Sequence, residues 1–126
     1  MKLLTSLVAV PLLLALGSAA EAACVYPQAP QSFPNGQKAT KEEMLTAQGT
    51  IKEYSKTVQE TYLPCLEEEM NTAIAALDPA DPEFEKKKVS AEAIHAKKHN
   101  AALDELQAVA DHWKVEMTAY KAKAAQ

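Results

Sequence analysis

The sequence predicts an all-α protein in which two long helices form an antiparallel, coiled-coil-like hairpin, with an extended N-terminal segment pinned to it by a disulfide. Apolar residues recur every three or four positions from Met44 to Leu77, which is helical periodicity. After residue 82, two further apolar stripes recur every seven positions, which is typical of a coiled coil. The chain of 126 residues contains two cysteines, Cys24 and Cys65, which could join the segment to the first helix.

The composition argues against nucleic-acid binding. The chain has 13 cationic residues, all of them lysine, against 17 acidic residues, and its net charge is −4. Without arginine it lacks the guanidinium fork that reads bases and grips phosphates. A net negative chain also lacks the basic surface of a nucleic-acid binder. We therefore expect no nucleic-acid partner.

Residues 1–22 have the order of regions found in a secretory signal peptide. Lys2 supplies a positive charge, residues 3–16 are almost wholly apolar, and small residues follow. We expect cleavage before Ala23, with cleavage before Glu21 as a competitor. The apolar run is short for a bilayer span, so we expect a periplasmic or secreted protein without stable membrane insertion after cleavage. A lipid anchor on Cys24 and an uncleaved N-terminal anchor are the alternatives.

Export would place both cysteines in an oxidising compartment. Two cysteines allow a single intramolecular disulfide, Cys24–Cys65; two free thiols or an intermolecular bridge are the alternatives. On the chain-entropy model, closing a loop of roughly 42 residues stabilises the fold by about 4 kcal/mol. That is a large contribution for a chain with so thin a core.

Residues 23–39 are rich in proline, and Asn35-Gly36 is a turn signal. We expect this stretch to be extended and irregular and to pack on the helices through Val25, Tyr26 and Phe33.

The helical hairpin is expected over residues 40–126, with its first helix at about 41–77. Thr40 and Glu43 have the spacing of a capping box. Pro64 lies inside the helical pattern, and we expect it to kink the helix near residues 60–64; a full break is the alternative. The apolar positions that would face the second helix are Met44, Ala47, Ile51, Tyr54, Val58, Tyr62, Cys65, Leu66, Met70, Ala73 and Leu77.

The second helix is expected at about 82–123, with Asp81 as its N-cap and Pro82 in its first turn. Two apolar stripes would face the first helix. We call them the Val89 stripe (Val89, Ala96, Leu103, Ala110 and Met117) and the His99 stripe (His99, Leu106, Trp113 and Tyr120). In an antiparallel pair joined near residue 80, residue numbers of facing positions should sum to about 160. Tyr54 would then meet Leu106, and Tyr62 would meet His99.

The candidate site residues are few. Glu92, His95 and His99 have a spacing that can hold a transition metal, but two histidines on one helix make a weak site without a further ligand. A hydrogen bond from His99 to Tyr62 is the structural alternative. The sequence contains neither the H-E-x-x-H pattern of metalloproteases nor the G-x-S-x-G elbow of hydrolases. We expect no catalytic residues and no cofactor.

Three short motifs resemble a group of small exported proteins of Gram-negative bacteria whose function is unknown. The motifs are Cys24-Val-Tyr-Pro, Ala39-Thr-Lys-Glu-Glu-Met-x-x-Ala-Gln-x-x-Ile-Lys-x-Tyr54 and Tyr62-Leu-x-Cys65. Together they cover residues 24–66. The resemblance implies an envelope location and a framework built on the two cysteines, and it implies no catalytic residue.

These observations favour a non-enzymatic periplasmic or secreted helical protein that acts by binding or as an envelope structural component. Its partner would be another protein or a second copy, in a four-helix arrangement. The alternatives are weak transition-metal handling and a chaperone-like holdase activity.

Overall fold

The computed structural model describes residues 23–126, so the expected signal peptide lies outside the described residues. It contains α1 (Lys41–Thr57), the π-helical turn η1 (Val58–Tyr62), α2 (Leu63–Ala75) and α3 (Phe84–Ala124). Within the described range all regular secondary structure is helical, which confirms the predicted class. No helix in that range is both long enough and apolar enough for a bilayer crossing.

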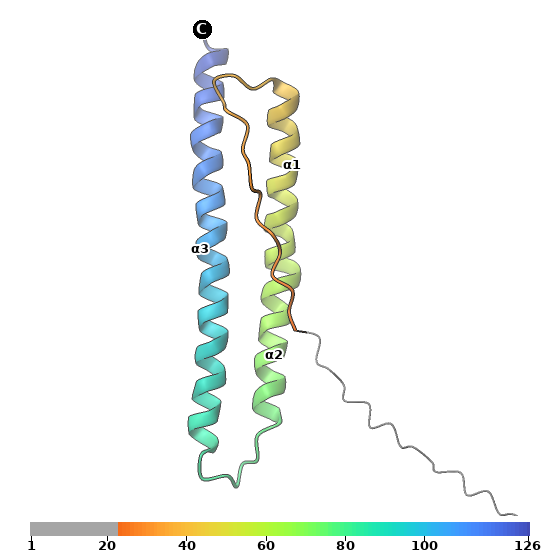
Figure 1. Ribbon diagram of the computed structural model, residues 1–126, viewed down its shortest axis with the longest axis vertical. Helices are drawn as coiled ribbons and strands as arrows, with labels where there is room; N and C mark the ends of the chain where they lie inside the picture. Colours follow the sequence, from red (N-terminus) through yellow and green to blue (C-terminus); the bar gives the residue numbers. More distant parts are fainter. Residues whose placement is uncertain (1–22) are drawn as a thin grey trace, which may run out of the picture.

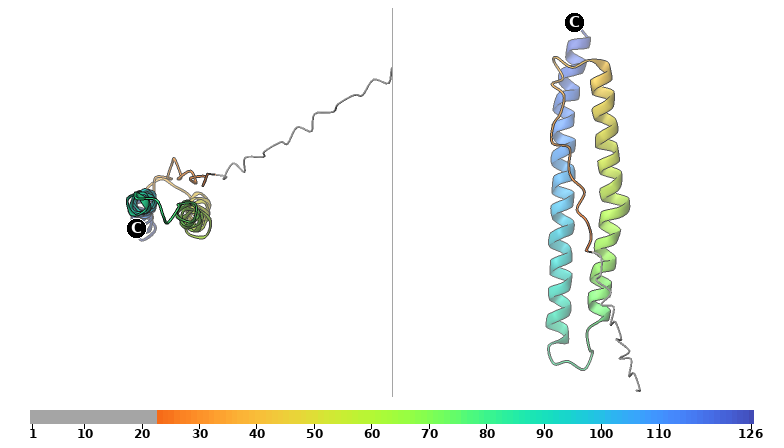
Figure 2. Two further views of the ribbon diagram at one scale, coloured as in Figure 1. Left: turned by 90° about the horizontal axis from the view of Figure 1, so that it is seen from below. Right: turned by 45° about the vertical axis from the view of Figure 1, so that its right-hand side comes forward.

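The elements lie side by side along one long axis. The first arm, which we define as α1, η1 and α2, runs down the molecule, and α3 runs back beside it (Figure 1). Seen from the end, the extended N-terminal segment (residues 23–40) lies on one side of the two helices (Figure 2). α3 packs more closely on α2 than on α1.

The first arm begins with the predicted capping box. The Thr40 hydroxyl accepts a hydrogen bond from the Glu43 amide at 3.2 Å, and the Glu43 carboxylate accepts one from the Thr40 amide at 2.7 Å. Two amide groups that the first helical turn leaves free are thereby satisfied.

Pro64 changes the helix type and does not break the first arm. The helical conformation is continuous from Lys41 to Ala75, and at η1 the Leu63 amide donates to the Val58 carbonyl, five residues back. A proline ring inside a helix collides with the carbonyl four residues earlier, here that of Glu60. The wider π turn makes room for the ring.

The π turn also aligns the core. Tyr54, Val58, Tyr62 and Leu66 are buried in one cluster although they follow each other at steps of four. An α-helix completes a turn in 3.6 residues, so four such residues would drift around its axis. A π turn takes more residues per revolution, and it keeps all four on the face towards α3.

The connection between α2 and α3 is longer than predicted because its aspartates stabilise turns. The Asp78 side chain accepts from the Ala80 amide at 2.9 Å, and the Asp81 side chain accepts from the Glu83 amide at 2.8 Å. Side-chain bonds to the amide two residues ahead are Asx turns. The predictions of Asp81 as the N-cap and of Pro82 in the first helical turn are therefore wrong: Glu83 is the N-cap, and α3 begins at Phe84.

The prediction that both α3 stripes face the first arm was half wrong. Ala102 is completely buried in the core cluster, whereas its neighbour Leu103, from the Val89 stripe, is 43% exposed. Val109 is likewise buried, and Ala110 is exposed. The first arm contributes large side chains to the core, so α3 fits against it with smaller ones. The His99 stripe is half-buried, as expected.

The N-terminal segment is extended and irregular, as predicted. The Asn35 carbonyl accepts from the amides of Lys38 at 3.0 Å and Ala39 at 2.7 Å, which forms the expected turn. The prediction that Val25 packs on the helices was wrong, since the residue is 86% exposed.

Candidate functional site

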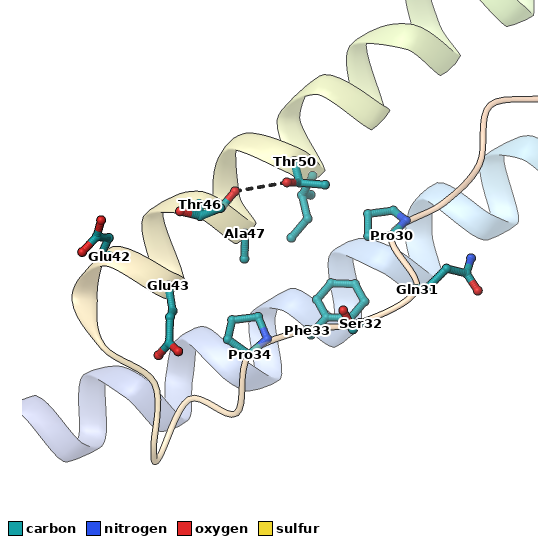
Figure 3. A pocket seen from close by; sticks show the side chains of 11 residues that line it. Pro30, Gln31, Ser32, Phe33, Pro34, Glu42, Glu43, Thr46, Ala47 and Thr50 are labelled. Carbon is teal, nitrogen blue, oxygen red and sulfur yellow. Dashed lines mark hydrogen bonds between the residues drawn. The ribbon is translucent and has the colours of Figure 1, made fainter.

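The N-terminal segment and α1 enclose a groove of about 510 Å3 (Figure 3). One wall comes from the segment and carries Pro30, Phe33 and Pro34, while the other is the face of α1 that carries Thr46 and Thr50. A smaller hollow of about 430 Å3 lies between the two elements and shares Pro30 and Thr50 with the groove.

Some polar side chains of the groove are engaged with backbone groups of the same chain. The Thr50 hydroxyl donates to the Thr46 carbonyl at 3.2 Å. The amide of Thr40 holds the pKa of the Glu43 carboxyl below its ordinary value, so Glu43 stays ionised in its capping box. Prolines and engaged hydroxyls are suited to contact with a ligand or another chain, and they do not form an acid–base pair.

The N-terminal segment is held to the first arm by a covalent bond. Cys24 and Cys65 form a disulfide with 5.8 Å between their Cα atoms, which confirms the predicted pairing. Both half-cystines line a hollow of about 530 Å3 together with Glu68 and Glu69. Glu69 forms an ion pair with Lys98, and this contact joins α2 to α3 at the same level. The hydrogen bond from Lys98 lowers the pKa of Glu69.

Two residues after Cys24, Tyr26 fastens the segment to both the first arm and α3, and we call this contact the tyrosine clasp. The ring of Tyr26 meets that of Tyr62 edge-on, with 4.9 Å between ring centres, and the Tyr26 hydroxyl donates to Glu105 of α3. The hydroxyl of Tyr54 lies beside this pair; it is buried and has no hydrogen-bond partner within residues 23–126. The segment therefore contacts the first arm and α3 through one side chain.

The pKa values of both tyrosine hydroxyls in the clasp are raised. For Tyr26 the main cause is burial, followed by the hydrogen bond to Glu105, and for Tyr54 the main cause is burial. Both hydroxyls remain protonated at neutral pH, so Tyr26 can donate to the Glu105 carboxylate.

The far end of the segment is attached to α3. The Gly36 amide donates to Glu116 at 2.7 Å, and the Lys123 ammonium donates to the Ala39 carbonyl at 2.8 Å. These contacts hold the turn at residues 35–39 against the last turns of α3.

An aromatic contact lies between the clasp and this turn. The Phe33 ring stacks on His112 with 4.1 Å between ring centres, and His112 lies 3.7 Å from the Glu116 carboxylate. Phe33 is therefore an anchor, as predicted. His112 is exposed on α3 and supports the segment through this contact.

The candidate metal ligands are only partly brought together. The rings of His95 and His99 are neighbours on α3, with 5.6 Å between their centres, while Glu92 is exposed. Among residues 23–126, no group of three or more histidine, cysteine or acidic side chains has the geometry to hold a metal ion. The hydrogen bond suggested between His99 and Tyr62 is not formed among the described side chains; the Tyr62 ring meets Tyr26 instead.

Glu105 and Glu116 hold the N-terminal segment, and neither role was predicted from the sequence. Both are acidic residues in a helix with many charges, and nothing in their spacing sets them apart. A usable signal was Gly36, because a glycine after asparagine in a proline-rich segment indicates a turn or a close backbone approach.

Comparison with known proteins adds no relative: no family model, curated protein or solved structure matches this chain. The resemblance to small exported Gram-negative proteins therefore stays a prediction from the three motifs.

Proposed function

We propose that the chain is a non-enzymatic periplasmic or secreted protein that acts by binding or as an envelope structural component. Its working form would be a long antiparallel, coiled-coil-like hairpin with the N-terminal segment stapled over one face. The observation that carries the proposal is the fastening of that segment by the Cys24–Cys65 disulfide, the Tyr26 clasp and the Gly36–Glu116 contact.

This fastening supports a binding role because it gives a thin protein a defined surface. Preorganised surfaces bind with a smaller entropic cost than mobile ones. The disulfide also supports export, since such bonds persist in oxidising compartments. The groove along α1 offers prolines, Phe33 and threonine hydroxyls at a continuous, partly apolar surface.

Binding can be tested with envelope extract from the source cells. Disulfide-bonded protein is immobilised and compared with the same protein after reduction and alkylation, which frees the N-terminal segment. The proposal expects a partner that the disulfide-bonded form retains and the reduced form loses. Equal retention by both forms, or no partner in extract and after cross-linking in cells, would contradict it.

Location has a separate test. Fractionation should place the protein in the periplasm or the medium, and intact mass should give a mature chain that starts at Ala23 or Glu21. Recovery of the unprocessed chain in the cytoplasm would contradict export.

Metal handling is the second candidate, and the adjacent rings of His95 and His99 favour it. Titration of zinc and copper into the wild type and into His95→Ala distinguishes the two functions. A clear loss of affinity in the variant would support metal handling, and equally weak binding by both proteins would dismiss it.

A further inference from the structure

The Val89 stripe is a heptad stripe that the single chain leaves open to solvent. Val89, Ala96, Leu103 and Ala110 are exposed, and Met117 is half-buried. From Val89 to Met117 the stripe advances 28 positions along α3, or about 42 Å at 1.5 Å per residue. Seven-residue spacing of apolar side chains is the pattern with which one helix packs along another.

This stripe lies on the opposite side of α3 from the N-terminal segment. Glu105 and His112 contact the segment, and Leu103 and Ala110 each precede one of them by two positions. Two positions correspond to about 200° around a helix of 3.6 residues per turn. The segment therefore covers one face of the helix pair, and the Val89 stripe lies on the other.

A hollow on α1 continues this open face. It measures about 760 Å3, and its lining includes Leu45, Gln48, Ile51 and Trp113. Gln48 lies two positions after Thr46, which lines the groove under the N-terminal segment, so the hollow is on the far side of α1. The open face thus spans α1 as well as α3.

The stripe is symmetric in side-chain size about Leu103. Large and small residues alternate outwards from it, and both ends are large. If a second α3 lies antiparallel with the two Leu103 side chains facing, Val89 meets Met117 and Ala96 meets Ala110. An interface related by a twofold axis needs this kind of self-complementary surface.

The charges beside the stripe fit the same register. Glu85 and Glu92 lie near its start, and Lys114 and Lys121 near its end. In the antiparallel register centred on Leu103, Glu92 faces Lys114 and Glu85 faces Lys121. None of these four residues takes part in an ion pair within the described part of the chain. A parallel pair would place each glutamate against its own copy, which is unfavourable.

We propose that a second copy of this chain covers the open face, with the two α3 helices antiparallel and Leu103 on the twofold axis. The first arms then also face each other, which closes the Trp113 hollow and forms a four-helix arrangement with both N-terminal segments outside. This inference rests on the proposed non-enzymatic function and names one partner for it.

Sedimentation equilibrium of the purified, disulfide-bonded protein provides the first test. The wild type should dimerise at micromolar concentration. Leu103→Glu should raise the dissociation constant about 100-fold, because two carboxylates then meet on the axis. The matched control is Val115→Glu: Val115 is 64% exposed on α3 but lies outside the stripe, so this variant should remain dimeric. Circular dichroism checks that each variant stays helical.

Charge exchange tests the register. Glu92→Lys should weaken the dimer, and the double variant Glu92→Lys/Lys114→Glu should restore it, because the facing charges are opposite again. A monomeric wild type at high micromolar concentration would overturn the proposal. So would a Leu103→Glu variant as dimeric as Val115→Glu, or a double variant that restores nothing. If the wild type is monomeric, the dimer proposal fails, but the capture experiment with envelope extract still tests the proposed binding function. Failure of the dimer and failure of the proposed function can therefore be told apart.

Discussion

The Gly36 amide donates a hydrogen bond of 2.7 Å to the Glu116 carboxylate, and Gly36 also lies directly against the backbone of α3. A Cβ atom at this position would lie 2.0 Å from the Glu116 carbonyl oxygen and 2.9 Å from the Tyr120 nitrogen. Since α3 backbone atoms cannot move aside as a side chain can, the turn docks here only because residue 36 has no side chain. The contact fixes the upper end of the N-terminal segment.

Gly36→Ala should therefore destabilise the protein. The methyl group would force the segment away from α3, and overpacking of this kind costs about 1–3 kcal/mol. Gly49→Ala is the matched control, because its Cβ would meet nothing within 4 Å and it lies inside α1. That change should stabilise by about 0.5–1 kcal/mol. Urea unfolding of both variants measures the difference, and a shared sign would show that Gly36 is not tightly packed.

Loss of the disulfide should cost more than loss of a single hydrogen bond or ion pair. We expect Cys24→Ser/Cys65→Ser to lose up to about 4 kcal/mol of unfolding free energy, because the unfolded chain gains freedom in the opened loop. Thermal unfolding of wild type with and without reductant should show the same loss. The bond itself is checked by intact mass after alkylation. Two alkyl groups added without reduction would contradict the disulfide.

The core cluster allows a comparison of two identical substitutions in the first arm. Leu66 is 2% exposed and Leu45 is 57% exposed. Leu66→Ala leaves a cavity among the core side chains and should cost about 2–5 kcal/mol. Leu45→Ala should change the unfolding free energy by less than about 0.5 kcal/mol. Similar losses in denaturant unfolding would mean that the core is not centred on the Tyr54–Leu66 face.

The helices of the first arm could be predicted because large apolar side chains there alternate with polar ones. The largest of these side chains fall on one face, which is therefore the face that is buried; they are Met44, Tyr54, Val58, Tyr62 and Leu66. In α3, which of two neighbouring apolar residues is buried depends on how much space the first arm leaves for its side chain. That space is a property of the assembled core, so the sequence alone favoured the larger Leu103 over Ala102.

The candidate site was less predictable than the helices. The Tyr26–Glu105 and Gly36–Glu116 contacts join residues about 80 positions apart in sequence. They depend on the path of an irregular segment, which no periodic pattern encodes. The Cys24–Cys65 pairing could be predicted because two cysteines leave a single intramolecular choice.

The capping box at the start of α1 makes the stability depend on pH. The hydrogen bond from Thr40 lowers the pKa of Glu43 below its ordinary value of 4.5. A carboxyl whose pKa is lower in the folded state stabilises the fold above the unfolded pKa, and this stabilisation is lost as the pH falls through the folded pKa. The difference in stability between wild type and Glu43→Gln should thus be full at pH 7 and shrink below pH 4.5. Glu42→Gln is the control, because Glu42 lies in the same first turn outside the capping box. Urea unfolding between pH 7 and pH 2 measures both differences, and matching pH profiles for the two variants would mean that the capping box is not the source.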